Sequence, residues 1–96
     1  MVTEFAQIEV KPGMEEAFIE GVRKSQPLFL AAHGCHAMGL QRSIETPTAF
    51  LLIVGWETVE DHMVTFRSSP AYQEWRANVG AYFAAPPTVW HGENLV

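Results

Sequence analysis

Apolar and polar residues alternate near the N-terminus, where Phe5 and Gln7 fall on one side of an extended chain and Ala6 and Ile8 on the other. Strict alternation is typical of a strand with one buried face, so we expect a strand over residues 2–10. The Lys-Pro-Gly sequence that follows ends this strand, because proline and glycine favour turns.

The next segment, residues 14–33, changes to a helical period. Ala17, Phe18 and Val22 lie on one face of the helix that this spacing predicts. Pro27 interrupts the pattern, because proline lacks a backbone donor and crowds the preceding turn. We therefore expect either a kink at Pro27 or a second short helix that begins there. Gly34 is expected to end the helical region.

Two strands are predicted in the middle of the chain, over residues 35–45 and 49–57, with a turn at 46–48 between them. The second of these strands is apolar at nearly every position. Such a strand is typically covered on both faces. Helices are expected to cover one face, and something else must cover the other.

A second helical region follows in two pieces. Thr58 is the expected N-cap of the first piece, with Asp61 at its third position, and this helix runs to about Arg67. Ser69 is expected to cap a second helix over residues 70–83, with Pro70 at its first position. Residues 88–96 then form the predicted last strand.

This order of elements predicts an α+β fold, the ferredoxin-like βαββαβ arrangement with a four-stranded antiparallel sheet and helices on one face. The 96 residues are expected to form one domain, residues 1–96. Hydrophobic residues make up 48% of the chain and charged residues 18%. This apolar composition favours a second copy packed against the open face of the sheet, and so a homodimer.

The charge pattern excludes several functions. Eleven acidic residues against six basic ones give a net charge of −5, and the scattered basic residues make nucleic-acid binding improbable. No apolar run is long enough to span a membrane, and the N-terminus does not resemble a signal peptide. Cys35 is the only cysteine, which precludes an internal disulfide. These features together favour a cytoplasmic protein.

Several short motifs together resemble the antibiotic biosynthesis monooxygenase family over about residues 4–92. They are Gly34-Cys35, Trp56-Glu57-Thr58, Asp61-His62, Phe66 to Pro70, and Trp75-Arg76. The resemblance implies a dimeric α+β barrel built from two ferredoxin-like subunits. The family includes oxygenases that need no cofactor, haem-degrading enzymes and an isomerase-like branch, so the reaction does not follow from the fold.

The resemblance implies a cofactor-independent monooxygenase that acts with O₂ on a small electron-rich aromatic substrate, such as a quinol, an anthrone or a phenol. Such chemistry needs a proton acceptor, and His62 is the candidate catalytic residue. It shares a helical face with Val59 and Phe66, so it is expected to point toward the sheet. An imidazole can accept a proton near neutral pH, although a histidine at the edge of the core is equally compatible with this pattern.

Aromatic and polar residues could line a pocket beside His62. The aromatic stripe of the second helical region matches a pocket wall and an ordinary core equally well. Trp90 and His91 alternate on the last strand, so only one of them faces the helices. The candidate substrate-binding residues are Trp56, Phe66, Tyr72, Trp75, Gln7 and His91.

Two alternatives stay open at this point, and a third is disfavoured. A non-catalytic dimeric module could bind a small ligand in the same pocket. Haem-degrading relatives carry Asn, Trp and His where this chain has Ala6 or Gln7, Phe66 and Arg76, which weakens a haem-binding role. The His-Gly-Cys-His sequence at 33–36 lacks a fourth ligand and splits its side chains between two faces, so no metal site is expected.

Overall fold

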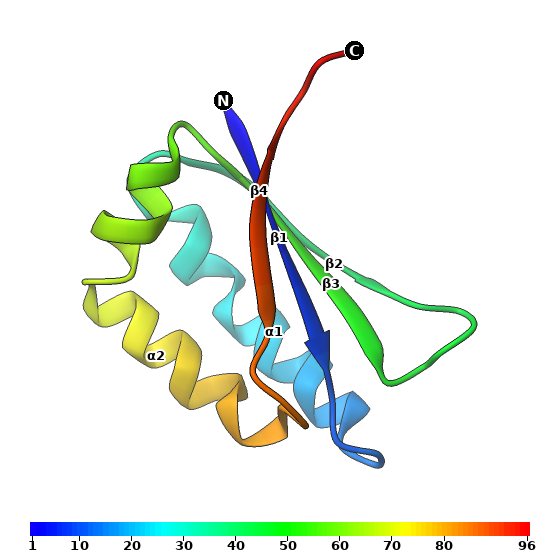
Figure 1. Cartoon of the computed structure of the whole chain (residues 1–96). Helices are drawn as coiled ribbons and strands as arrows, with labels where there is room; N and C mark the ends of the chain where they lie inside the picture. Colours follow the sequence, from blue (N-terminus) through cyan, green and yellow to red (C-terminus); the bar gives the residue numbers. More distant parts are fainter.

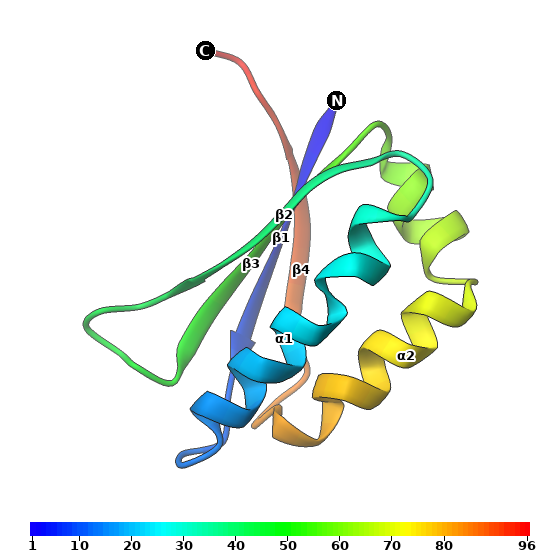
Figure 2. The same ribbon diagram turned by 180° about the vertical axis from the view of Figure 1, so that it is seen from behind.

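The computed structural model describes all 96 residues and shows a four-stranded sheet with helices on one face only (Figure 1, Figure 2). All the strands pair antiparallel, in the order β2-β3-β1-β4. The ferredoxin-like fold predicted from the sequence is confirmed. The elements are β1 (Val2–Glu9), α1 (Glu15–Leu30), β2 (Cys35–Arg42), β3 (Ala49–Trp56), η1 (Asp61–Phe66), α2 (Pro70–Val79), η2 (Gly80–Tyr82) and β4 (Thr88–Glu93).

Helix α1 is continuous through Pro27, and the alternative of a second helix beginning at this residue is wrong. The backbone N–H of Ala31 donates to the carbonyl of Pro27, so the last turn keeps its helical hydrogen bond. The helix ends at Leu30, three residues before the predicted end at residue 33. Gly34 lies beyond it with φ +79°, in the turn that leads into β2.

The second helical region begins and divides as the sequence predicted. The Oγ1 atom of Thr58 accepts the N–H of Asp61, and the Oγ atom of Ser69 accepts the N–H of Tyr72. The first piece, η1, is a π-helix rather than the expected α-helix. The second piece, α2, ends at Val79, and η2 continues the chain as one 3₁₀ turn, so the predicted helix over 70–83 was too long.

The core fills the space between the sheet and the helices. Phe18 and Phe29 of α1 pack against sheet residues such as Leu52 and Val54, and all four are almost completely buried. The side chains on the other face of β3, among them Ile53, are only half-buried. None of the helices combines the length and the apolar character that a membrane crossing needs.

Candidate active site

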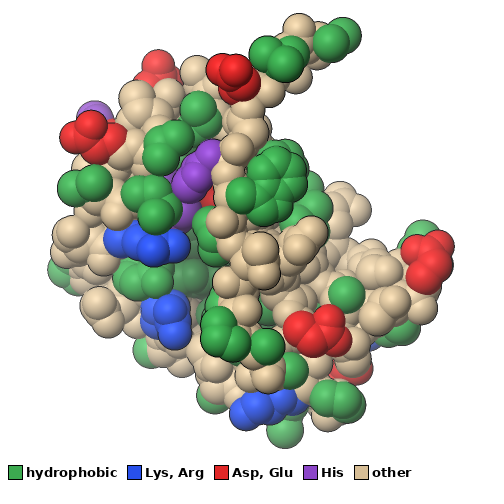
Figure 3. Space-filling model, viewed as in Figure 1, with side chains coloured by type: hydrophobic (Ala, Val, Ile, Leu, Met, Phe, Trp, Pro, Cys, Tyr) green, Lys and Arg blue, Asp and Glu red, His purple; other side chains and the backbone are tan.

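A cavity of about 210 Å³ lies between the helix-bearing face of the sheet, η1 and α2. Four of the predicted site residues line it: His62, Phe66, Tyr72 and Trp75. Most of the other lining side chains are apolar and come from β1, β3 and β4 or their ends. Figure 3 shows the site from outside, with a histidine beside two basic side chains on this face of the molecule.

His62 is held in place by the π-helical geometry of η1. The backbone N–H of Arg67 donates to the carbonyl of His62, five residues earlier, which widens the turn. The imidazole is 3% exposed and stacks on the indole of Trp56, with ring centroids 5.3 Å apart and planes 15° apart. Isolated π-helical turns often occur at functional sites, so this geometry supports a special role for His62.

Glu4 is a functional candidate that the sequence analysis missed. Its side chain comes from β1, lines the cavity and is 4% exposed. The Oε1 atom accepts the indole N–H of Trp56 at 2.9 Å and lies 3.3 Å from the Nε2 atom of His62. Burial raises the pKa of Glu4 to about 6, against smaller opposing effects of the Trp56 hydrogen bond and the Arg67 charge.

His91 completes a row of three polar side chains. It faces the helices, whereas Trp90 lies on the open face and stacks on Phe5. The Nε2 atom of His91 lies 2.8 Å from the Nδ1 atom of His62. Burial lowers the pKa of His62 to about 4, assisted by the charges of His91 and Arg67. Burial followed by the Arg67 charge also lowers the pKa of His91.

The row of contacts favours one arrangement of protons. Both histidines are neutral at pH 7, so each has one N–H to donate. If His91 donates to the Nδ1 atom of His62, the N–H of His62 is on Nε2 and points to the Glu4 carboxylate. This arrangement leaves the indole N–H of Trp56 as the hydrogen-bond donor to the buried carboxylate, with the Nε2 atom of His62 3.3 Å from the same oxygen. The other Glu4 oxygen has no partner in the protein and is available to the cavity.

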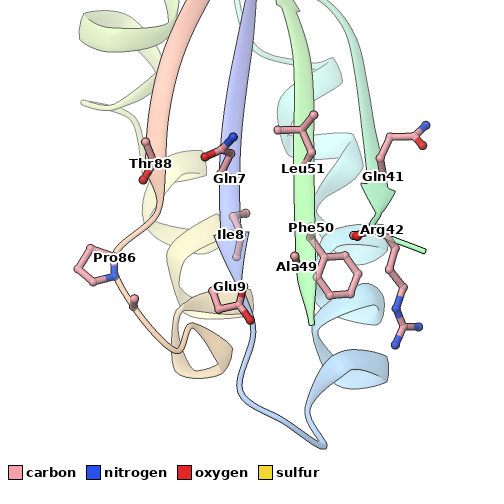
Figure 4. Close-up of a pocket in the computed structure, with 12 residues that line it drawn as sticks. Gln7, Ile8, Glu9, Gln41, Arg42, Ala49, Phe50, Leu51, Pro86 and Thr88 are labelled. Atoms are coloured by element: carbon pink, nitrogen blue, oxygen red, sulfur yellow. The ribbon is translucent and has the colours of Figure 1, made fainter. Parts of the chain in front are cut away.

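The remaining predicted site residues lie away from the cavity. Trp56 is completely buried behind His62 and supports it. Gln7 points from the opposite face of the sheet into a larger, shallow hollow of about 530 Å³. Figure 4 shows Gln7 there in a row with Thr88, Leu51 and Gln41, which are paired across the four strands. None of the buried titratable groups reaches that hollow.

The His-Gly-Cys-His sequence does not gather its side chains at one point. The Nε2 atom of His33 is 3.7 Å from a carboxylate oxygen of Asp61, and His36 contacts Glu57 at 2.6 Å. The thiol of Cys35 donates to the carbonyl of Ala37. These groups are directed to separate partners.

Most of the positions at which this chain differs from haem-degrading relatives lie in the cavity wall. Ala6, Phe66 and Arg76 line the cavity, and Gln7 does not. The histidine in the cavity wall, His62, has both ring nitrogens directed at protein groups. An axial haem ligand needs a free ring nitrogen, so the donor set does not fit haem.

A sequence signal for Glu4 does exist. On β1, Glu4 has the same parity as Ala6 and Ile8, so it belongs to the row that faces the helices. A lone carboxylate in an otherwise apolar row is unusual, because burying a charge without a partner is costly. Parity alone does not reveal its partners, since Trp56 and His62 are more than fifty residues away along the chain.

Comparisons with known proteins agree with this fold. The antibiotic biosynthesis monooxygenase family profile matches residues 1–78. A crystal structure of a Bordetella bronchiseptica protein named for this family superposes with a TM-score of 0.97, at 49% identity, covering 99% of this chain and 97% of the other. A Nitrosomonas europaea structure, also named for the family, shares the fold at 24% identity and a TM-score of 0.86, with full coverage of both chains.

A curated Bacillus subtilis (strain 168) protein, the uncharacterized protein YczJ, is 36% identical over 95 residues, which cover 99% of this chain and all of that protein. The profile match extends over most of the chain, and the sequence identity extends over nearly all of it. This chain therefore belongs to the antibiotic biosynthesis monooxygenase family.

Proposed function

We propose that this protein is a cofactor-independent monooxygenase that oxidises a small electron-rich aromatic substrate with O₂. The observation that carries the proposal is the Glu4 carboxylate, which is buried at the cavity wall and held by Trp56 and His62. A base that works near neutral pH needs a pKa close to that pH. Burial raises the pKa of Glu4 to about 6, which suits this role.

The proposal assigns a shared role to Glu4 and His62. Glu4 offers an oxygen to the cavity and accepts the substrate proton there. Both nitrogens of His62 face protein groups, so His62 acts by donating toward the carboxylate and fixing its position. His91 and Trp56 hold the imidazole from two further sides. Support of this kind is what keeps a catalytic group in one geometry.

The reaction follows from removal of one proton. A phenolate or enolate formed at Glu4 transfers an electron to O₂, and the resulting radical and superoxide combine to give a carbon-bound peroxide anion. This anion takes back the proton held by Glu4 and becomes a hydroperoxide, which regenerates the base. Loss of water from this hydroperoxide leaves a carbonyl group on the substrate. One oxygen atom ends in the product and the other in water, and all four electrons come from the substrate. Apolar walls such as Phe66 and Trp75 keep bulk water from the intermediates.

The size of the cavity restricts the substrate. A buried apolar cavity of about 150 Å³ accommodates benzene. The cavity beside Glu4 measures about 210 Å³. It therefore suits one or two rings, and among the expected substrate classes it favours a simple phenol or quinol over a three-ring anthrone.

The open face of the sheet supports a second proposal, that the protein is a homodimer. Phe5 and Trp90 stack at 4.4 Å on this face, beside the half-buried Ile53. Trp90 is 48% exposed in the single chain. A second copy packed sheet to sheet would cover these side chains and enclose the hollow that contains Gln7.

Oxygen uptake with 1,4-dihydroxynaphthalene tests the oxygenase proposal. Glu4→Gln keeps an acceptor for the Trp56 N–H but cannot take a proton, so we expect kcat to fall by about 10²–10⁴. His36→Gln serves as the control, because His36 is an exposed histidine whose carboxylate partner, Glu57, lies outside the cavity. Rates corrected for spontaneous oxidation that are equal in Glu4→Gln and the native protein would contradict the mechanism. Binding of the quinol without turnover would favour the ligand-binding module instead.

The pH dependence of kcat distinguishes the role of Glu4 as the proton acceptor from the role of His62 as the residue that positions it. Activity needs ionised Glu4, so in the native protein it should rise with pH through about 6. His62→Ala removes a donor that stabilises the carboxylate, which raises the pKa of Glu4 further. We expect the acid limb of kcat to move to higher pH and the maximum rate to fall. An unchanged limb would show that His62 does not act through Glu4.

A further inference from the structure

Arg67 stands at the cavity with an unused hydrogen-bond donor. It follows η1 directly, its side chain lines the cavity, and its Nε atom is buried without a hydrogen-bond partner. Leaving a buried donor unpaired costs free energy, and the cost is larger for a charged group. The structure contains no ion pair between Arg67 and any carboxylate.

A second guanidinium lies on the same wall. Arg76 projects from α2, one turn after Tyr72, and its Nη1 atom donates to the Tyr72 hydroxyl at 3.3 Å. Both residues line the cavity. Arg76 also has no ion pair with a carboxylate, whereas Arg23 and Arg42, which lie elsewhere, contact Glu20 and Glu16.

This arrangement is notable in a chain with a net charge of −5. Eleven acidic side chains are available for pairing, yet the cavity retains two unpaired guanidinium groups. The cavity carboxylate, Glu4, is directed toward Trp56 and His62 instead. The cavity thus holds two cationic side chains together with the Glu4 carboxylate, and the Arg67 charge is near enough to lower the pKa of Glu4.

We propose that the substrate of this cavity is an aromatic carboxylate, whose carboxyl group binds Arg67 and Arg76 while its hydroxyl group faces Glu4. This inference rests on the proposed function, because it names the substrate class of the same site. A guanidinium matches a carboxylate through two parallel hydrogen bonds. Both guanidinium groups line the cavity without a carboxylate partner, and Arg76 holds the Tyr72 hydroxyl in the same wall.

The position of the charges makes chemical sense for the proposed reaction. A carboxylate on Arg67 would fix one end of the ring, so that the hydroxyl at the other end is presented to the base. Positioning of this kind is a large part of catalysis. The same guanidinium groups would balance the negative charge that develops when the hydroxyl loses its proton.

Calorimetric titration tests the inference without turnover. The ligands are 2,5-dihydroxybenzoate and 1,4-dihydroxy-2-naphthoate, each compared with its neutral carboxamide under anaerobic conditions. We expect at least one acid to bind roughly tenfold or more tightly than its amide, the difference typical of a charge-assisted hydrogen bond. Arg67→Gln and Arg76→Gln should each reduce this preference, and the double variant should remove it. Arg23→Gln, on the exposed side of α1, should keep it.

Two results would overturn the inference: amides that bind as tightly as both acids, or an acid preference that survives when both Arg67 and Arg76 are replaced by Gln. Measurements of oxygen uptake keep the two proposals distinct. Preferential binding of an acid without oxidation would retain the anion site and refute the oxygenase. Equal oxidation of a neutral quinol and its carboxylate would retain the oxygenase and refute the anion site.

Discussion

Glu4 and His62 are in contact in the protein interior, and folding shifts their pKa values in opposite directions. The folded state raises the pKa of Glu4 from its ordinary 4.5 to about 6, chiefly through burial. It lowers the pKa of His62 from 6.5 to about 4, for the same reason. Folding therefore favours the uncharged form of each side chain. The consequences for stability have opposite signs and overlap in the same pH range.

The pH dependence of unfolding checks this pair. Between about 4.5 and 6, folded Glu4 holds a proton that the unfolded chain has lost, so its contribution to stability falls as pH rises. Between about 4 and 6.5, the unfolded chain protonates His62 and the folded one does not, so stability rises with pH. We expect a steeper rise with pH in Glu4→Gln and a shallower one in His62→Gln, measured by urea unfolding at several pH values. Parallel curves for the three proteins would contradict the assigned shifts.

Prediction from the sequence was uneven at this scale. Helical spacing directed His62 and Phe66 toward the sheet, and both line the cavity, whereas Val59, which was assigned to the same face, is 43% exposed. Glu4 and Arg67 became candidates only in three dimensions. Glu4 is notable because it contacts Trp56, which is distant in the sequence, and Arg67 is notable because its Nε atom has no hydrogen-bond partner. Neither fact follows from local sequence.

At the level of elements, the widened turn of η1 links the site to the loop before β2. Asp61 begins η1, and its carboxylate lies against Gly34, which has φ +79°. A Cβ atom at Gly34 would collide with this carboxylate. The glycine thus allows the loop to approach η1 closely at the point where the π-helix starts.

Substitution of Gly34 measures this contact. Gly34→Ala should destabilise the fold by more than the roughly 1–2 kcal/mol that a left-handed backbone costs an alanine. Gly13→Ala is the matched control, since Gly13 has φ +88° and open space around it. Thermal and urea unfolding of the two variants should differ by the cost of the collision. Equal losses of stability would show that Asp61 moves aside freely.

The caps of the helices were more predictable than their interiors. Ser69, Pro70 and Thr58 function as local sequence signals led us to expect, because caps depend on neighbouring residues. The π-helical character of η1 was missed. An extra residue in a turn is stabilised by tertiary contacts such as the Trp56–His62 stack, which local sequence does not encode.

For the whole molecule, the two faces of the sheet differ in how completely their side chains are buried. The helix-bearing face contains the buried core and the cavity. The opposite face carries apolar side chains with only partial cover, and it was the apolar pattern of residues 49–57 that pointed to this asymmetry. The arrangement of strands followed from the sequence because few topologies fit this order of elements.

A single substitution that introduces a charged side chain tests whether two copies associate through the open face of the sheet. Ile53→Arg places a cation in the middle of this face without touching the helix-side core, so the proposed dimer should dissociate to monomers. Ile44→Arg is the control, because Ile44 is 90% exposed in the loop between β2 and β3. Light scattering coupled to size-exclusion chromatography gives the mass, and circular dichroism confirms folding. A folded Ile53→Arg dimer would place the interface elsewhere.

The sheet order also has a consequence for biosynthesis. Strand β1, the first to be made, is paired on its outer side by β4, the last, and both chain ends lie at the same end of the sheet (Figure 1). A ribosome adds roughly 5–20 residues per second, so His91 is synthesised several seconds after Glu4. Until then, one edge of β1 is free to pair with other chains. A truncated product lacking β4 would thus be an aggregation hazard, and it would also lack the His91 contact to His62.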